Sequence, residues 1–199
     1  MKRYELIQFF IDKYKYKKYL EIGVRQKENF DNIQIDFKEG VDPDSNVKTT
    51  YNMSSDVFFE KFKNKKYDII FVDGNHNGDF VYRDIKNSIK CLNSGGIIIC
   101  HDCNPLSELF QLRVDHPLRK GIGSWNGTVW RAWVKLRSEL DKNMFVVDSD
   151  QGLGVIKEGV QEKIDSSFCL MEYIDFRKDF KKILNLITIE QFFVNENLL

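Results

Sequence analysis

Two short motifs combine carboxylates with imidazoles directly after apolar stretches. Residues 69–72 are apolar and run into Asp-Gly-Asn-His at 73–76, and residues 97–100 run into His101 and Asp102. A carboxylate can hold a cation, and an imidazole titrates near neutral pH and can move a proton. The two motifs therefore predict a site for acid–base or cation-binding chemistry.

The apolar stretches before these motifs have no alternation of polar and apolar residues. Such runs are typical of central strands in a parallel sheet that is covered by helices on both faces. In an open α/β sheet, ligands bind outside the carboxyl ends of the strands. Glu21, Asp42 and Asp73 all stand at predicted strand ends, so we expect three acids along one edge of the sheet.

A glycine turn follows the first predicted strand. Gly23 would let the backbone approach a ligand closely, and an acid such as Asp42 can accept both hydroxyls of an unphosphorylated ribose. This pattern favours an adenosine-containing ligand. Residues 23–29 hold a single glycine instead of the G-x-G-x-x-G pattern, and this difference disfavours a dinucleotide such as NAD.

Composition excludes several classes of protein. The chain has 199 residues with 30 basic and 30 acidic side chains, so one domain is expected and no net charge points to nucleic acid. No apolar run approaches the roughly 20 residues of a membrane span, and the N-terminus is too mixed for a signal peptide. We therefore expect a cytoplasmic protein. Its cysteines would be ordinary thiols, although two of them have C-x-x-C spacing; they are Cys91, Cys100, Cys103 and Cys169.

The remaining pattern predicts a Rossmann-like α/β fold for a single domain over residues 1–199. Seven strands would form a mostly parallel sheet with helices on both faces and a C-terminal antiparallel hairpin. The long aperiodic segment 103–127 would be a substrate or lid loop. The predicted strands are 19–24, 40–44, 49–53, 66–73, 97–102, 144–147 and 153–156. The predicted helices include 1–16, a short one at 28–33, those capped near Ser54 and Asn77, 128–140, and one at 176–193 within a helical extension over 159–199.

At these motifs the chain resembles the class I S-adenosylmethionine-dependent methyltransferases. The matching residues are Leu-Glu-Ile-Gly-Val at 20–24, Val-Asp-Pro at 41–43, Asp-Gly-Asn-His at 73–76 and His-Asp at 101–102. The group with Asp-Gly-x-His and His-Asp includes O-methyltransferases of small molecules and sugars. The resemblance covers most of the chain, about residues 19–156, and implies methyl transfer from S-adenosylmethionine to a hydroxyl.

The resemblance also implies roles for individual residues. Glu21 and Gly23 would hold the methionine part of the cofactor, Asp42 would bind the ribose, and Asp73 would lie near the sulfonium and the acceptor. Met53, Ser54 and Ser55 would line the adenine side. For acceptor activation the candidates are Asp102, His76 and His101.

Catechol-type relatives imply a divalent metal such as Mg²⁺. Asp73 and Asp102 match two of its ligands, but Cys103 replaces the usual asparagine, and Asn104 follows one step later. Without metal, His76 or His101 could act as the general base.

Several alternatives stay open. Asp73 could cap a helix, His76 could be an ordinary loop histidine, and His101 could only orient Asp102. Trp125 and Asn126 are the better candidates for substrate contact, while Trp130 and Trp133 fit a core helix face. Basic residues in the loop weakly favour an anionic acceptor such as a sugar or glycan precursor. A non-catalytic cofactor-binding module, an NAD-type oxidoreductase and a homodimer also stay open.

Overall fold

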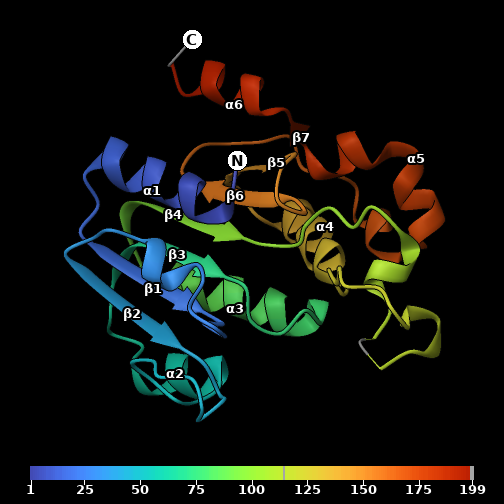
Figure 1. Cartoon of the computed structure of the whole chain (residues 1–199). Coiled ribbons are helices and arrows are strands. Elements are labelled where there is room, and N and C mark those ends of the chain that lie inside the picture. Colours follow the sequence, from blue (N-terminus) through green and yellow to red (C-terminus); the bar gives the residue numbers. More distant parts are fainter. Residues whose placement is uncertain (114, 198–199) are drawn as a thin grey trace.

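The computed structural model describes residues 1–113 and 115–197. Residue 114, inside the predicted lid loop, and residues 198–199, in the predicted C-terminal extension, lie outside the described residues. The described strands form one seven-stranded sheet of order β2-β1-β3-β4-β6-β5-β7 (Figure 1). The strands are β1 (Lys18–Ile22), β2 (Phe37–Val41), β3 (Tyr67–Val72), β4 (Leu92–Cys100), β5 (Asn143–Val147), β6 (Leu153–Lys157) and β7 (Leu186–Ile187).

Strand pairing confirms the predicted sheet. Strands β2, β1, β3 and β4 are parallel neighbours, β5 and β6 form the antiparallel hairpin, and β6 is antiparallel to β4. The register aligns Ile22 with Val41 and Val72, and Val72 with Cys100. The residues that directly follow these four strand positions must therefore lie along one edge.

Helices cover both faces of the sheet (Figure 1). Helices α1 (Arg3–Tyr14) and α6 (Ile189–Asn195) pack on one face, where Phe10 and Phe192 are fully buried. On the opposite face, α4 buries Trp130 and Trp133, so these two residues belong to the core. Burying a large apolar side chain stabilises a fold by roughly 1.5–3 kcal/mol. The helices on this opposite face are α2 (Ser55–Lys61), α3 (Gly78–Lys90), α4 (Val129–Glu139) and α5 (Tyr173–Leu184).

Three predictions about secondary structure were wrong. Residues 49–53 form no full strand, because only Tyr51 bridges to Val41. Residues 176–193 are two helices instead of one: Asn185 adopts a left-handed conformation that ends α5, and β7 then pairs with β5. The hairpin is consequently not the last part of the sheet. The short helix expected at 28–33 is only a 3₁₀ turn, Phe30–Asn32.

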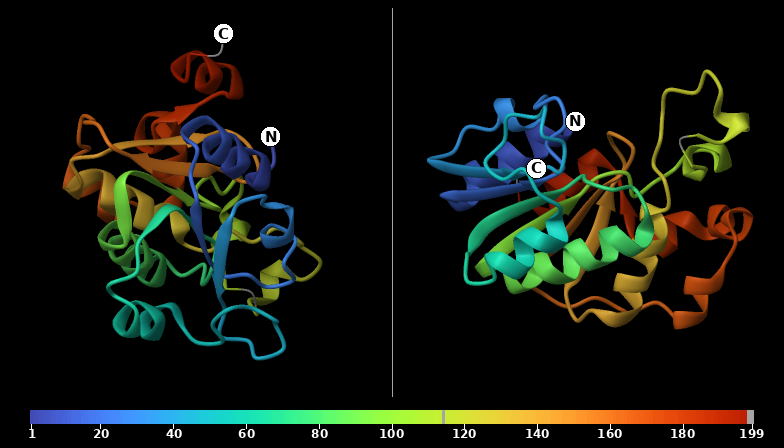
Figure 2. Two further views of the ribbon diagram at one scale, coloured as in Figure 1. Left: turned by 90° about the vertical axis from the view of Figure 1, so that its left-hand side faces the viewer. Right: turned by 90° about the horizontal axis from the view of Figure 1, so that it is seen from below.

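Both predicted helix caps are confirmed. The Ser54 hydroxyl accepts a hydrogen bond from the backbone N–H of Val57, and the Asn77 side chain accepts one from Asp79. The described residues of the segment 103–127 contain 3₁₀ turns but no α-helix or strand, and this yellow-green segment extends beyond the body of the molecule (Figure 2). Over the described ranges, no helix has the length and apolar character that a bilayer crossing needs. All four cysteines are free thiols.

Candidate active site

The ends of β1 and β3 approach each other unusually closely. Gly23 has φ +87°, and a Cβ atom there would lie 2.2 Å from the main-chain oxygen of Asp73. Only glycine fits this position without moving the backbone. Gly23 therefore sets the distance between the first loop and the Asp-Gly-Asn-His motif.

Three carboxylates, one arginine and two histidines form one cluster at the carboxyl ends of β3 and β4. Arg3 Nη1 lies 2.7 Å from Asp73 Oδ2, and Arg3 Nε lies 3.1 Å from Asp150 Oδ2. His101 Nδ1 lies 2.9 Å from Asp102 Oδ2 and 3.4 Å from Asp73 Oδ1. Arg3 and His101 thus bind the same acids from two sides.

His101 is enclosed by this cluster. Its side chain is only 2% exposed, and its Nε2 lies 3.6 Å from Asp150 Oδ1. Burial alone would lower the pKa of His101, but Asp73, Asp102 and Asp150 together raise it well above its usual value. His101 is therefore a charged group that holds three carboxylates together.

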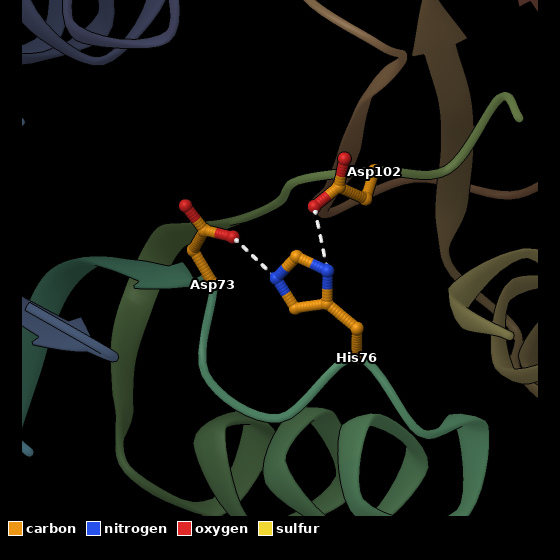
Figure 3. Close-up of side chains that lie close together, drawn as sticks. All are labelled: Asp73, His76 and Asp102. Carbon is orange, nitrogen blue, oxygen red and sulfur yellow. Dashed lines mark ion pairs between the residues drawn. The ribbon is translucent and has the colours of Figure 1, made fainter. Parts of the chain in front are cut away.

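His76 lies between two of the carboxylates (Figure 3). Its Nε2 is 3.5 Å from Asp73 Oδ1, and its Nδ1 is 3.3 Å from Asp102 Oδ2. Burial lowers the pKa of His76, but the two acids outweigh burial and raise it. Unlike the enclosed His101, this side chain is 18% exposed, so it is the imidazole that an acceptor could reach.

The pKa values of Asp73 and Asp150 are shifted downward, opposite to those of the two histidines. Burial would raise the pKa of Asp73, but His101, His76 and Arg3 outweigh burial and lower it below the usual range. The pKa of Asp150 is lowered in the same way, since burial is outweighed by His101 and Arg3. Both aspartates are therefore anionic at neutral pH.

Strained backbone supports the cluster. Asp102, Asp150 and Gln151 have φ values of 64°, 43° and 64°, in the left-handed region that non-glycine residues rarely adopt. The turn that carries Asp150 is fixed to the chain after β4, because Cys103 N–H donates to the Gly152 carbonyl at 3.0 Å. Strain of this kind is common at functional sites.

Asp42, the predicted ribose ligand, lies at the same edge after β2. Its Oδ2 accepts hydrogen bonds from the backbone N–H groups of Val24 and Arg25 at 3.0 and 2.8 Å, and its Oδ1 accepts one from Asp44. One lone pair of Oδ1 is left for a ligand. In the first loop, Arg25 and Lys27 take φ values of 47° and 65°, so the backbone makes glycine-like turns without glycine.

Glu21 lies below the edge, inside the sheet. It is 1% exposed, and its Oε2 accepts hydrogen bonds from the Tyr19 hydroxyl and from Asn29. Burial raises the pKa of Glu21 to about 8, although both hydrogen bonds lower it. A largely neutral Glu21 supports the first loop through its hydrogen bond with Asn29.

The residues predicted to line the adenine, 53–55, directly follow the segment in which Tyr51 forms an isolated β-bridge with Val41. Ser54 is exposed and caps α2, while Met53 and Ser55 are half-buried. Ser55 hydrogen-bonds to Asp84 of α3, whose pKa is raised to about 6 by burial despite this bond. Asp84 is 2% exposed, and its contact with Ser55 was not predicted from the sequence.

The predicted substrate residues cover His76. The Trp125 ring stacks on the imidazole, with ring centroids 4.5 Å apart. Asn126 is 1% exposed and donates to the carbonyl oxygens of Asp102 and Gln151 at 3.3 Å. Asn126 is thus a buried anchor of the loop, whereas Trp125 covers His76, and its contact with a substrate stays a prediction.

Two members of the cluster were not predicted from the sequence. Asp150 lies in the turn 148–152 of the hairpin, and the antiparallel pairing of β6 with β4 brings this turn to the active edge. The two aspartates of this turn are a sequence signal from which the turn could have been predicted to be part of the site. Arg3 gave no signal, since it begins an ordinary amphipathic helix.

Comparison with known proteins supports the predicted resemblance. Residues 11–103 match the family model described as "Methyltransferase domain". No curated protein matches this chain. The family match includes Gly23, Asp42, Asp73, His76 and Asp102, but it leaves out Arg3, Trp125 and Asp150.

Solved structures that resemble this chain include O-methyltransferases. A protein described as a caffeoyl-CoA O-methyltransferase of Staphylococcus aureus has a TM-score of 0.55 and 16% identity, covering 78% of this chain and 82% of its own. An O-methyltransferase of Bacillus cereus in complex with SAH has a TM-score of 0.55 and 11% identity, covering 78% and 80%. The methyltransferase PaMTH1 of Podospora anserina, bound to SAH, has a TM-score of 0.54 and 15% identity, covering 79% and 78%. The chain therefore has the class I methyltransferase fold.

Proposed function

We propose that this chain, a class I methyltransferase fold with a methyltransferase domain over residues 11–103, methylates a hydroxyl group of a small molecule. One observation carries the proposal: Asp73, His76 and Asp102 lie together at the carboxyl edge of the sheet, and Asp42 lies at the same edge after β2. S-adenosylmethionine would supply the methyl group on a positively charged sulfur. The anionic cluster around Asp73 provides the complementary charge.

The residues of the chain have separate tasks in this proposal. Asp42 holds the ribose through its remaining Oδ1 lone pair, and Gly23 lets the first loop lie against it. Met53, Ser54 and Ser55 border the adenine. Asp73 faces the sulfonium, and Trp125 covers the acceptor so that water is excluded. The site works mainly by alignment, which can supply several kcal/mol of rate enhancement.

Proton removal from the acceptor belongs to the group of Asp73, His76 and Asp102. Without metal, His76 is the base, because it is the partly exposed imidazole of the cluster and Asp102 holds its ring. His101 is enclosed, so we assign it to holding the carboxylates. A divalent metal would be held by Asp73 and Asp102 and, when bound, would lower the pKa of the acceptor hydroxyl.

The acceptor class follows from the cover of the site. Trp125 presents an aromatic ring, and Arg119, whose guanidinium lies 5.8 Å from that ring, adds a buried positive charge beside it. These two side chains suit a ring-shaped acceptor that carries an anionic group, such as a phosphorylated or nucleotide-linked sugar. A cytoplasmic location remains our prediction.

The test combines binding with turnover. Calorimetry should show binding of S-adenosylhomocysteine to the wild type, and labelled S-adenosylmethionine should transfer its methyl group to one member of a panel of phenols, catechols and sugar phosphates. Asp102→Asn should lose most of the turnover at saturating cofactor. Absence of S-adenosylhomocysteine binding would contradict the proposal.

A non-catalytic binding module is the second candidate. Arg3 already occupies one oxygen of Asp73, and Trp125 lies on the proposed base. If S-adenosylhomocysteine binds but no acceptor of the panel is methylated, this second function would be favoured.

A further inference from the structure

The cluster contains a set of metal ligands that includes an imidazole. Among the described residues, Asp73, His76 and Asp102 each offer one ligand atom, and these atoms lie within 4.8 Å of one another. Asp102 Oδ1 is buried and has no hydrogen-bond partner in the described part of the chain. An unpaired buried carboxylate oxygen is costly, and a cation would satisfy it.

The asparagine ligand that the resemblance implies has no counterpart here. Cys103 stands in its place, is fully buried, and its Sγ contacts the Cys100 carbonyl oxygen at 3.6 Å. Asn104 is also committed elsewhere: its Oδ1 accepts from Arg177 at 2.9 Å and its Nδ2 donates to Asp148 at 3.2 Å. A third protein ligand must therefore come from another residue.

The surroundings of His76 prepare its Nε2 atom for coordination. Nδ1 lies 2.9 Å from the Trp125 carbonyl oxygen, and since a carbonyl only accepts, Nδ1 must carry the proton. The Nε2 lone pair of the neutral ring then faces Asp73 Oδ1 at 3.5 Å. The repulsion between this lone pair and the carboxylate oxygen is relieved either by a proton on Nε2 or by a metal ion bound between the two atoms. A backbone carbonyl that fixes the second nitrogen is a usual feature of metal-binding histidines.

Asp73 is oriented for the same task. Arg3 takes Oδ2, so Oδ1 is the oxygen that faces His76. The stacked Trp125 ring, with an interplanar angle of 20°, holds the plane of the imidazole. The ligand atoms are thus fixed by partners outside the ligand set.

We propose that His76 is an imidazole ligand of a divalent metal that Asp73 and Asp102 also hold, and that this site selects first-row transition ions over Mg²⁺. The inference rests on the metal placement in the proposed function. Imidazole suits ions such as Zn²⁺ and Fe²⁺, whereas Mg²⁺ prefers oxygen ligands. Any site of this kind binds Zn²⁺ more tightly than Mn²⁺. Coordination by His76 is therefore recognised by how much the imidazole increases the preference of the site for transition ions over Mg²⁺.

The experiment measures binding of Zn²⁺, Mn²⁺ and Mg²⁺ to the full chain by calorimetry. His76→Gln should weaken Zn²⁺ and Mn²⁺ binding by at least about tenfold and should change Mg²⁺ binding much less. His116→Gln is the matched control, because His116 lies in the separate segment 103–127, where its Nδ1 accepts a hydrogen bond from the Leu118 N–H. In pulsed electron paramagnetic resonance, bound Mn²⁺ should show nitrogen coupling that His76→Gln abolishes.

Three results would overturn the inference: no binding of any of the three ions, an equal loss of affinity for all three in His76→Gln, or nitrogen coupling that survives this substitution. Thermal unfolding of His76→Gln checks that the variant is folded. Binding of S-adenosylhomocysteine is measured separately without metal. A protein that binds this nucleoside but no metal keeps the proposed function and refutes only the role of His76.

Discussion

Individual carboxylates of this site each contact several ion-pair or hydrogen-bond partners. Asp73 contacts Arg3, His76 and His101, and Asp42 accepts three backbone hydrogen bonds. These several contacts fix each carboxylate in one orientation. A fixed orientation is required to align the methyl donor with the methyl acceptor.

Asp42→Asn tests the ribose contact. The substitution replaces a charged acceptor by a neutral one, and a hydrogen bond to a charged group contributes about 1.5–3 kcal/mol. We expect S-adenosylhomocysteine to bind roughly 10- to 100-fold more weakly by calorimetry. The control is Asp44→Asn, two residues later on the exposed side of the same loop, which should bind like the wild type.

Glu21→Gln tests the buried carboxyl. The pKa of Glu21 is raised from 4.5 to about 8, so the fold favours its protonated form. Its contribution to the free energy of unfolding is complete below pH 4.5 and is lost as the pH rises to about 8. Urea unfolding across this range should show a flatter pH dependence for Glu21→Gln than for the wild type. The exposed Glu60→Gln should keep the wild-type slope; an unchanged slope in Glu21→Gln would contradict this account.

At the scale of elements, the site depends on where strands end. Parallel pairing with level ends at Ile22, Val41, Val72 and Cys100 brings distant acids into one row. The segment 103–127 covers this row of acids through Trp125. The β5–β6 turn adds Asp150, because β6 runs antiparallel to β4. The close approach of β1 and β3 depends on one glycine.

Gly23→Ala should damage this junction severely. A Cβ at Gly23 would meet the Asp73 oxygen at 2.2 Å, in addition to the left-handed backbone that costs about 1–2 kcal/mol for alanine. Gly95→Ala is matched for conformation, with φ +74° and nothing within 4 Å of its Cβ. Urea unfolding should therefore show a clearly larger loss of stability for Gly23→Ala. Equal losses in both variants would mean that the contact with Asp73 is unimportant.

At the scale of the whole molecule, the site extends beyond the matched domain of residues 11–103. Helix α1 supplies Arg3, which joins the end of β3 to the β5–β6 turn. The Ser149 hydroxyl also donates to the Met1 carbonyl at 2.5 Å. The N-terminal helix is thus part of the site as well as of the core.

Arg3→Met tests this connection. It removes the partner of Asp73 and Asp150 while keeping much of the apolar stem, and we expect a loss of about 1–3 kcal/mol because two partly buried charged hydrogen-bond acceptors lose their donor. Arg83→Met, at the exposed pair with Asp56, should change stability much less than Arg3→Met, because solvent screens an exposed ion pair. A double-mutant cycle with Asp150→Asn should give a positive coupling energy, and additive effects would refute the connection.

The sequence by itself determined the sheet, its active edge and most of the acids on that edge. Apolar runs that end in acids are a local signal, and parallel pairing converts this signal into position. The chain order also gave Asp42, Asp73, His76 and Asp102. The expected third strand and the long C-terminal helix were wrong because short pairings and a left-handed Asn185 depend on neighbours.

Only the tertiary structure decided how these groups are paired. Arg3 and Asp150 are separated by 147 residues, and their contact arises from the packing of α1 beside the hairpin. Packing also made His101 an enclosed cation, left His76 facing two carboxylates and buried Asn126 as an anchor. Charge pairing and burial depend on distances in three dimensions, which local sequence patterns do not encode.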